Sequence, residues 1–152
     1  MKNPILLLSC LLACSTTFSQ KDSAQIYLKK GIVEKSAKRY LVASGYFDRA
    51  VRFDPGLKEA YLENGFVNIE MRKTDAAIAN FAKVLEIEPA NVDAASQLMD
   101  LYYNYKLYQK AIQLAAKCKT CANRQRMIGL CNFHLGNYGM GIKGTNALIP
   151  IP

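Results

Sequence analysis

The sequence predicts an all-α protein: a solenoid of antiparallel helix pairs, with three repeats and a degenerate fourth. A set of five residues returns after 34 positions, a period typical of stacked helical repeats. A proline stands near the end of both units, where a helix has to stop. No run of about 20 apolar residues occurs, so no transmembrane helix is predicted. Positions 4, 8, 20, 24 and 32 are Tyr61, Gly65, Ala77, Phe81 and Pro89 counted from Lys58, and Tyr27, Gly31, Ala43, Phe47 and Pro55 counted from Ala24.

Each recurring residue has a physical role in a helix pair. Small residues such as Gly65 and Ala77 let two antiparallel backbones approach closely, because larger side chains would hold them apart. Phe81 and Leu85 lie four residues apart on the second helix, so both are expected to face the core. Pro89 lacks an amide hydrogen and ends that helix.

This pattern resembles the tetratricopeptide repeat, a family of stacked helical pairs, over residues 24–148. The resemblance implies a right-handed superhelix whose concave groove binds a protein or peptide partner. It implies neither an enzyme nor a cofactor. The sequence agrees with this, because it has no glycine-rich phosphate loop, no nucleophile elbow and a single histidine.

The first two repeats follow the pattern closely. Lys30 stands at position 7, where an apolar residue is usual, and suits a first repeat whose outer face needs to be hydrated. Thr74 is a suitable residue to cap the start of a helix. The repeats are predicted at 24–57 and 58–91, with helices at about 24–37 and 40–53, then 58–71 and 74–87.

The third and fourth repeats depart from the pattern. The third, residues 92–121, is short and carries Met99 in place of glycine and Ala115 in place of the aromatic residue. A larger residue at one contact is thus partly offset by a smaller one nearby. The fourth, residues 122–148, restores Gly129 at position 8. Its second helix is doubtful, because each glycine within it costs up to about 1 kcal/mol relative to alanine; these glycines are Gly139, Gly141 and Gly144.

The first residues have the plan of a bacterial secretory signal peptide. Lys2 precedes an apolar run, Ile5–Ala13, and small polar residues follow. One cleavage removes residues 1–19. The alternative is a lipoprotein cut after residues 1–13, with Cys14 acylated as a membrane anchor; a further alternative is an uncleaved, buried N-terminal helix. Export to the periplasm or cell envelope is the expectation, and the lipoprotein alternative places the protein at the outer membrane.

The charge is unevenly distributed. Residues 21–100 carry 12 basic and 12 acidic side chains, whereas residues 101–152 carry 7 basic side chains and no acidic one. An anionic partner is one interpretation. A solvated helix face is favoured, because four lysines fall on the expected outer side of the second helices: Lys106, Lys110, Lys117 and Lys143. In an exported protein, no nucleic-acid partner is expected.

Cys118, Cys121, Cys131 and His134 follow a C-x2-C-x9-C-x2-H spacing, which can hold a tetrahedral zinc ion. Export favours a disulfide among the three cysteines over zinc, and free thiols are the third alternative. A bridge between Cys118 and Cys131 would join the third repeat to the fourth, with Cys121 as a competitor. The rival function carried by this cluster is a metal- or redox-responsive protein. Thioredoxin-like chemistry is not expected, because the C-x-x-C follows a helix end.

The resemblance places ligands along positions 2, 5, 9, 12 and 13 of each first helix, which form one helical stripe. The lysine and asparagine set with which some relatives clamp a terminal carboxylate is absent. We expect an amphipathic helix or extended peptide as partner, with an apolar anchor near Phe66. Alternatively, the chain's own N-terminal segment or Ile-Pro tail covers this surface, or the protein is a structural subunit of a larger envelope assembly. Tyr103 is included because Tyr102 and Tyr108 take expected core and helix-entry positions. The candidates are Leu28, Ile32, Leu62, Phe66, Ile69, Tyr103 and Arg126.

Overall fold

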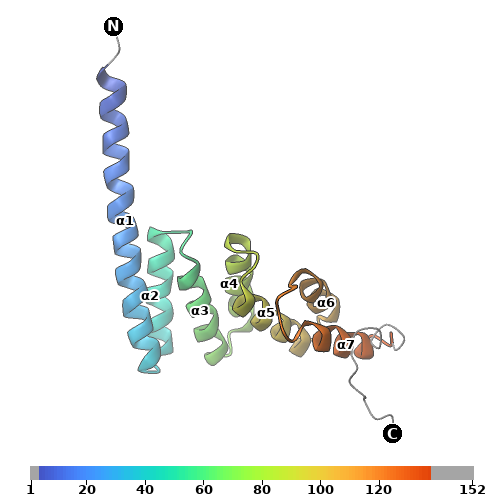
Figure 1. Cartoon of the computed structure of the whole chain (residues 1–152). Coiled ribbons are helices and arrows are strands. Elements are labelled where there is room, and N and C mark those ends of the chain that lie inside the picture. Colours follow the sequence, from blue (N-terminus) through green and yellow to red (C-terminus); the bar gives the residue numbers. More distant parts are fainter. Residues whose placement is uncertain (1–3, 138–152) are drawn as a thin grey trace. The chain divides into compact units, whose positions relative to one another are not determined.

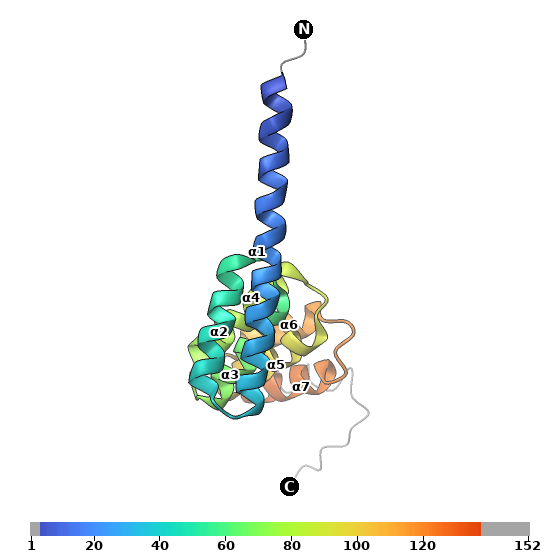
Figure 2. The same ribbon diagram turned by 90° about the vertical axis from the view of Figure 1, so that its left-hand side faces the viewer.

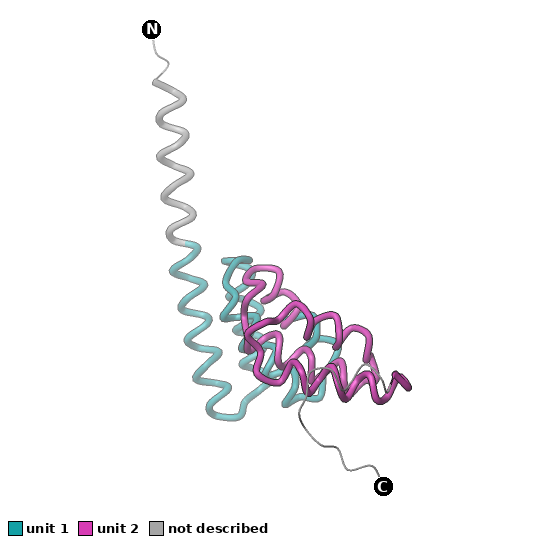
Figure 3. Tube along the Cα trace, turned by 45° about the vertical axis from the view of Figure 1, so that its right-hand side comes forward, with its two compact units in different colours: residues 1–80 teal, residues 81–152 magenta. Residues whose placement is uncertain are grey.

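The computed structural model describes residues 4–137, with side chains from residue 20 onward. These residues form seven helices and no strand, which confirms the all-α prediction. The chain divides into two compact units, Met1–Asn80 and Phe81–Pro152, coloured teal and magenta in Figure 3. Within the described residues, no helix combines the length and apolar character needed to cross a bilayer.

Unit 1 contains three helices and the start of a fourth. The antiparallel helices α1 (Pro4–Ser36) and α2 (Tyr40–Phe53) lie side by side, and α3 (Lys58–Glu70) packs against α2 (Figure 1, Figure 2). The division between the units falls within α4 (Thr74–Ile87). Helix α1 is continuous from well before its expected start at Ala24, whereas α2 and α4 have the predicted bounds.

The core of unit 1 forms where the small residues of the repeat meet its aromatic residue. Gly31 on α1 is buried against Phe47 on α2, whose side chain has no exposed surface. A Cβ atom added to Gly31 would lie 2.7 Å from Cδ1 and 2.9 Å from Cζ of Phe47, closer than carbon atoms pack. Position 8 therefore has to be small for the ring at position 24 to fit between the two helices.

Unit 2 contains the end of α4 followed by α5 (Val92–Asn104), α6 (Tyr108–Lys117) and α7 (Arg124–His134). Met99 at position 8 and Ala115 at position 24 are both fully buried in one cluster. The larger residue at position 8 is therefore combined with a smaller residue at position 24, as expected. The predicted second helix of the fourth repeat, with Gly139, Gly141 and Gly144, lies outside the described residues, as does the Ile-Pro tail. Positions 20 and 24 are fully buried in all of the first three repeats: Ala43, Ala77 and Ala111, and Phe47, Phe81 and Ala115.

One kind of turn follows α1, α3, α5 and α7. Its central residue has a positive φ: 59° at Lys38, 57° at Arg72, 60° at Lys106 and 76° at Gly136. This residue donates its N–H to the carbonyl three residues earlier, and the next residue donates to the carbonyl five residues earlier, all at 2.8–3.1 Å. This is the Schellman arrangement, which satisfies the last carbonyls of a helix. The intervals of 34, 34 and 30 residues equal those between the predicted repeat starts.

The α2–α3 interface contains a buried amide network. Asn64 and Asn68, at positions 7 and 11, are each only 4% exposed. Asn64 Oδ1 accepts a hydrogen bond from Ser44 Oγ at 2.8 Å, and Asn64 Nδ2 donates to Asp48 Oδ1 at 2.9 Å. Asn68 Nδ2 donates to the Asn64 carbonyl at 2.9 Å. Because the Asn64 amide is paired at both its oxygen and its nitrogen, its burial carries little desolvation penalty.

Candidate peptide-binding groove

At the predicted groove of unit 1, Lys35 on α1 reaches across to α3. Its Nζ atom lies 2.6 Å from Glu63 Oε2 and 5.0 Å from the centroid of the Phe66 ring. These two contacts place position 12 of the first repeat against positions 6 and 9 of the second. The first helices of the two repeats therefore share one continuous surface, which we call the α1–α3 face.

Apolar side chains line this face without being fully buried. Ile32 on α1 is 41% exposed, and Leu62, Phe66 and Ile69 on α3 are half-buried. Leu62, Phe66 and Ile69 follow one another at intervals of four and three residues, so they lie on one side of the helix. We call these four residues the groove floor. Partly exposed apolar side chains in such a contiguous set are typical of a surface that a partner covers.

The prediction for Leu28 is wrong, because this side chain belongs to the core. It is only 7% exposed and clusters with Ala24 and Phe47. Leu28 follows Ala24 by four residues and precedes Gly31 by three, so all three lie on the side of α1 that packs against α2. Position 5 is thus covered in the first repeat, whereas Leu62 at the same position of the second is half-buried.

Carboxylates flank the groove floor. Glu59 and Glu70 are exposed at positions 2 and 13 of α3, and Glu63 lies between them. Glu63 is compensated by Lys35, through the ion pair described above. Among the described residues, neither Glu59 nor Glu70 forms an ion pair. The α1–α3 face therefore presents two carboxylates around its apolar residues, although the chain as a whole carries a net charge of +8.

An aromatic cluster in unit 2 brings together side chains from α5, α6 and α7. The Tyr103 hydroxyl lies 3.0 Å from His134 Nε2, and the His134 ring stacks on Tyr108 with centroids 4.9 Å apart and planes 5° apart. Phe133 meets the same imidazole edge-on at 5.7 Å. The sequence predicts Tyr103 as a site residue but assigns Tyr108 only to the start of a helix. Stacking on His134 gives Tyr108 a place in the cluster that helix position alone does not reveal.

Arg126, the remaining groove candidate, is exposed on α7 and acts electrostatically on Asp100 of α5. Burial raises the pKa of the Asp100 carboxyl group, and the positive charge of Arg126 partly opposes that rise. Position 5 of the fourth repeat therefore interacts with position 9 of the third. Unit 2 thus presents polar and aromatic side chains at the positions where unit 1 presents its apolar floor.

The predicted disulfide among the three cysteines is confirmed, but its pairing needs correction. Cys118 and Cys121 are joined by a disulfide, and Cys131 is a buried free thiol. The predicted Cys118–Cys131 bridge is wrong, because the turn after α6 brings the Cα atoms of Cys118 and Cys121 to 5.5 Å while Cys131 faces the core. The zinc alternative with His134 loses two thiolate ligands to this disulfide. In the described part of the chain, no three His, Cys, Asp or Glu side chains are grouped to hold a metal ion.

Comparison with known proteins identifies the repeat. Residues 68–118 match the family model described as tetratricopeptide repeat. A crystal structure of MamA superimposes with a TM-score of 0.70 at 22% identity, covering 79% of this chain and 68% of that one. YrrB, described as a TPR protein with an unusual peptide-binding site, gives a TM-score of 0.66 at 18% identity, covering 76% of this chain and 61% of its own. These likenesses establish the fold.

A similarity in sequence extends to one much larger protein. Over 108 residues, 67% of this chain, the sequence is 24% identical to a UDP-N-acetylglucosamine–peptide N-acetylglucosaminyltransferase of Giardia intestinalis. The match spans only 7% of that relative's length. Residues 68–118 therefore carry a tetratricopeptide repeat sequence, and the chain shares its fold with solved tetratricopeptide repeat structures.

Proposed function

We propose that this protein is an exported interaction module, not an enzyme, that holds a peptide or helix of a cell-envelope partner on its groove floor. The observation that carries the proposal is the half-buried Phe66, flanked on the same helix side by Leu62 and Ile69 and by Ile32 from α1. Tetratricopeptide repeats are protein-interaction modules, and the solved relative YrrB is described as having a peptide-binding site. Both support a binding role for the concave surface.

The charges around the floor specify the partner further. The ion pair between Lys35 and Glu63 holds the lysine over Phe66, so a bound apolar side chain would enter beside an already compensated pair. Glu59 and Glu70 remain to meet the partner. We therefore expect a segment that places an apolar anchor against Phe66 and carries lysine or arginine on either side of that anchor. Such complementarity mainly increases specificity and association rate.

Purification of the partner from the native envelope, followed by calorimetry with the isolated partner segment, tests this proposal. Phe66→Ala should weaken binding by about 2 kcal/mol or more, roughly 30-fold, if Phe66 is a central anchor. Phe53→Ala is the matched control, since this phenylalanine is 39% exposed on α2, away from the groove floor. If the wild type and the Phe66 variant had equal affinities and circular dichroism showed both to be folded, the groove floor would be excluded as the surface that binds the partner. A partner held through many subunit contacts and unaffected by Phe66 would favour the structural-subunit alternative.

Export is part of the proposal and has its own test. The basic start at Lys2 and the apolar run Ile5–Ala13 support removal of residues 1–19, or lipidation at Cys14. Intact mass spectrometry of the protein from its native host separates these outcomes. A mass beginning at Gln20 supports secretion, and a mass carrying acyl chains on Cys14 supports the lipoprotein route. A species that retains Met1 would contradict export by a cleaved signal.

A further inference from the structure

The outer side of the first helix pair carries a second surface, separate from the groove floor. Tyr27 on α1 stacks with Phe53 on α2, with centroids 5.4 Å apart and planes 8° apart, and with Tyr46 at 6.3 Å. Two cations also lie near the Tyr27 ring: Lys30 Nζ at 5.7 Å and the Arg49 guanidinium at 5.8 Å. We call this surface the end face.

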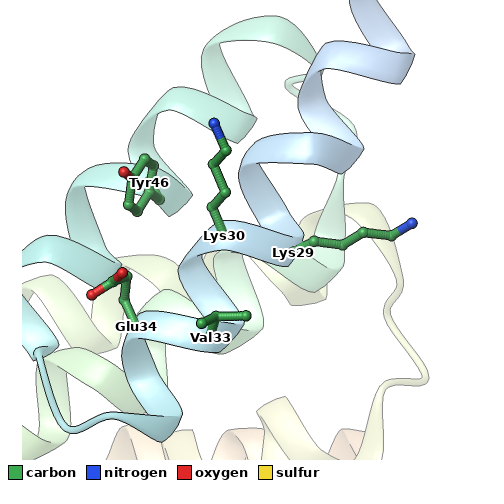
Figure 4. Close-up of a pocket in the computed structure, with 5 residues that line it drawn as sticks. All are labelled: Lys29, Lys30, Val33, Glu34 and Tyr46. Atoms are coloured by element: carbon green, nitrogen blue, oxygen red, sulfur yellow. The ribbon is translucent and has the colours of Figure 1, made fainter.

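A pocket of about 310 Å³ adjoins these rings, lined by Lys29, Lys30, Val33, Glu34 and Tyr46. Figure 4 shows Tyr46 from α2 beside Lys30 and Glu34 from α1, with Lys29 extending away from the tyrosine. Val33 is 62% exposed and Phe53 is 39% exposed, so the surface is more apolar than expected for a first repeat. Lys30 is exposed as predicted, and it lies near the Tyr27 ring and lines the pocket together with Val33 and Tyr46.

Repeat positions indicate what shape fits the end face. In the second repeat, positions 7 and 11 of α3 are Asn64 and Asn68, and Asn64 is bonded to Ser44 and Asp48 of α2. These positions therefore receive the second helix of the preceding repeat. In the first repeat the same positions are Lys30 and Glu34, which line the pocket. A helix in that place would continue the stacking that α2 performs on α3.

The charges indicate which helix fits. Glu34 is bound by Arg39, which compensates its charge. Among the described residues, no carboxylate forms an ion pair with Lys29, Lys30 or Arg49. An apolar helix would cover Val33 and Phe53 but would leave these cations without anionic partners as water is excluded. A helix with acidic residues beside its apolar stripe would satisfy both.

We propose that the end face docks an acidic amphipathic helix of a partner protein, in the place that the second helix of a preceding repeat would occupy. This surface is independent of the proposed groove function. The groove floor with its carboxylates would select basic segments, whereas the end face would select acidic ones. One molecule of this protein would then join two partners of opposite charge.

Two synthetic peptides test the proposal with the full-length chain. Both are helices of about 20 residues with leucines at i, i+3, i+4 and i+7, flanked by glutamates in one and by lysines in the other. The peptides are compared in the Phe66→Ala variant, which removes the groove-floor anchor that the lysine peptide would otherwise use. In that variant, fluorescence anisotropy should show the glutamate peptide binding about ten-fold or more tightly than its twin. The double variant Lys30→Glu, Arg49→Glu should reverse this preference, and Phe53→Ala should weaken both peptides. Phe66→Ala, on the groove floor, should leave the affinity for the glutamate peptide within about two-fold, the scatter expected for a site without shared contacts.

Several results would contradict the proposal that the end face docks an acidic helix. Equal affinity for the two peptides, no binding of either, or an unchanged preference in the charge-reversed variant would overturn the proposal. Analytical ultracentrifugation covers the remaining occupant, a second copy of this chain. A wild-type dimer that Phe53→Ala converts to monomers would show that the end face is a self-association surface, and would also overturn the acidic-partner proposal. Because the charge reversal alters only exposed side chains, it keeps the test valid if a ring substitution disturbs α2.

Discussion

The close contact between Gly31 and Phe47 predicts opposite effects for two similar substitutions. Gly31→Ala and Gly45→Ala each replace a helical glycine, which by itself stabilises a helix by about 0.5–1 kcal/mol. A Cβ at Gly45 meets no atom within 4 Å, whereas one at Gly31 meets the Phe47 ring at 2.7 and 2.9 Å. Phe47 is fully buried, so its ring can yield only by displacing its neighbours. Overpacking of this kind costs about 1–3 kcal/mol.

The magnitude follows from the difference between the two variants. The gain in helix propensity is common to both and cancels, so the free energies of unfolding should differ by about 1–3 kcal/mol in favour of Gly45→Ala. Urea denaturation followed by circular dichroism measures this difference, provided that the slope of the transition is unchanged. Gly45→Ala should raise the midpoint above that of the wild type.

A third variant separates packing from other causes. Phe47→Leu shortens the side chain that the new methyl group meets, so Gly31→Ala should be less harmful in that background. Residues in direct contact typically show coupling energies of about 0.5–3 kcal/mol in such cycles. Equal stabilisation by the Gly31 and Gly45 variants, or additive effects of Gly31→Ala and Phe47→Leu, would refute the claim that the ring at position 24 requires a glycine at position 8.

Three further predictions follow from single side chains. Ala77→Leu should lower the free energy of unfolding by about 1–3 kcal/mol because Ala77 is fully buried, whereas Ala79→Leu, on the exposed side of α4, should change it by less than about 0.5 kcal/mol in thermal or urea melts. Arg126→Gln should raise the pKa of Asp100 further, seen in a carboxyl NMR titration, because it removes the charge that opposes the effect of burial; an unchanged or lower pKa would contradict the interaction. Burial raises the pKa of Cys131, so above about pH 8.5 the folded state keeps a proton that the unfolded state loses. The resulting contribution to the free energy of unfolding is full below that pH and is lost as the pH rises. Cys131→Ala should therefore flatten the decline of the free energy of unfolding with pH, and the same slope in the variant as in the wild type would contradict this prediction.

The helix pairs were predictable because periodic signals determine them. The prolines and the spacing of Ala43, Phe47 and Ala50 define α2 from Tyr40 to Phe53, the bounds that the structure has. The Schellman turns were not predicted, because Lys38, Arg72 and Lys106 are not residues that favour positive φ. Their conformation is imposed by the two helices that the turn joins.

The groove was predictable only in part, because family positions describe an average repeat. Leu28 and Leu62 share position 5, yet the first is buried and the second half-buried. The disulfide depended on the path of a short turn, and spacing alone could not separate Cys121 from Cys131 as the partner of Cys118. The stacking of His134 on Tyr108 likewise depends on how three helices meet in a shortened repeat.

Positions 7 and 11 carry the strongest argument about specificity in unit 1. On α3 they are asparagines, and Asn64 requires the hydroxyl of Ser44 and the carboxylate of Asp48 on the helix that covers it. An apolar helix in place of α2 would leave the Asn64 Nδ2 donor buried without its acceptor, at a cost of about 1–3 kcal/mol, while Asn64 Oδ1 would keep only the 3.2 Å contact with Asn68 Nδ2. On α1 the same two positions hold Lys30 and Glu34, and Arg39 already compensates the glutamate. By the same reasoning, a helix that covers the end face has to bring an acceptor for Lys30, so the polar residues at these positions select which helix can stack.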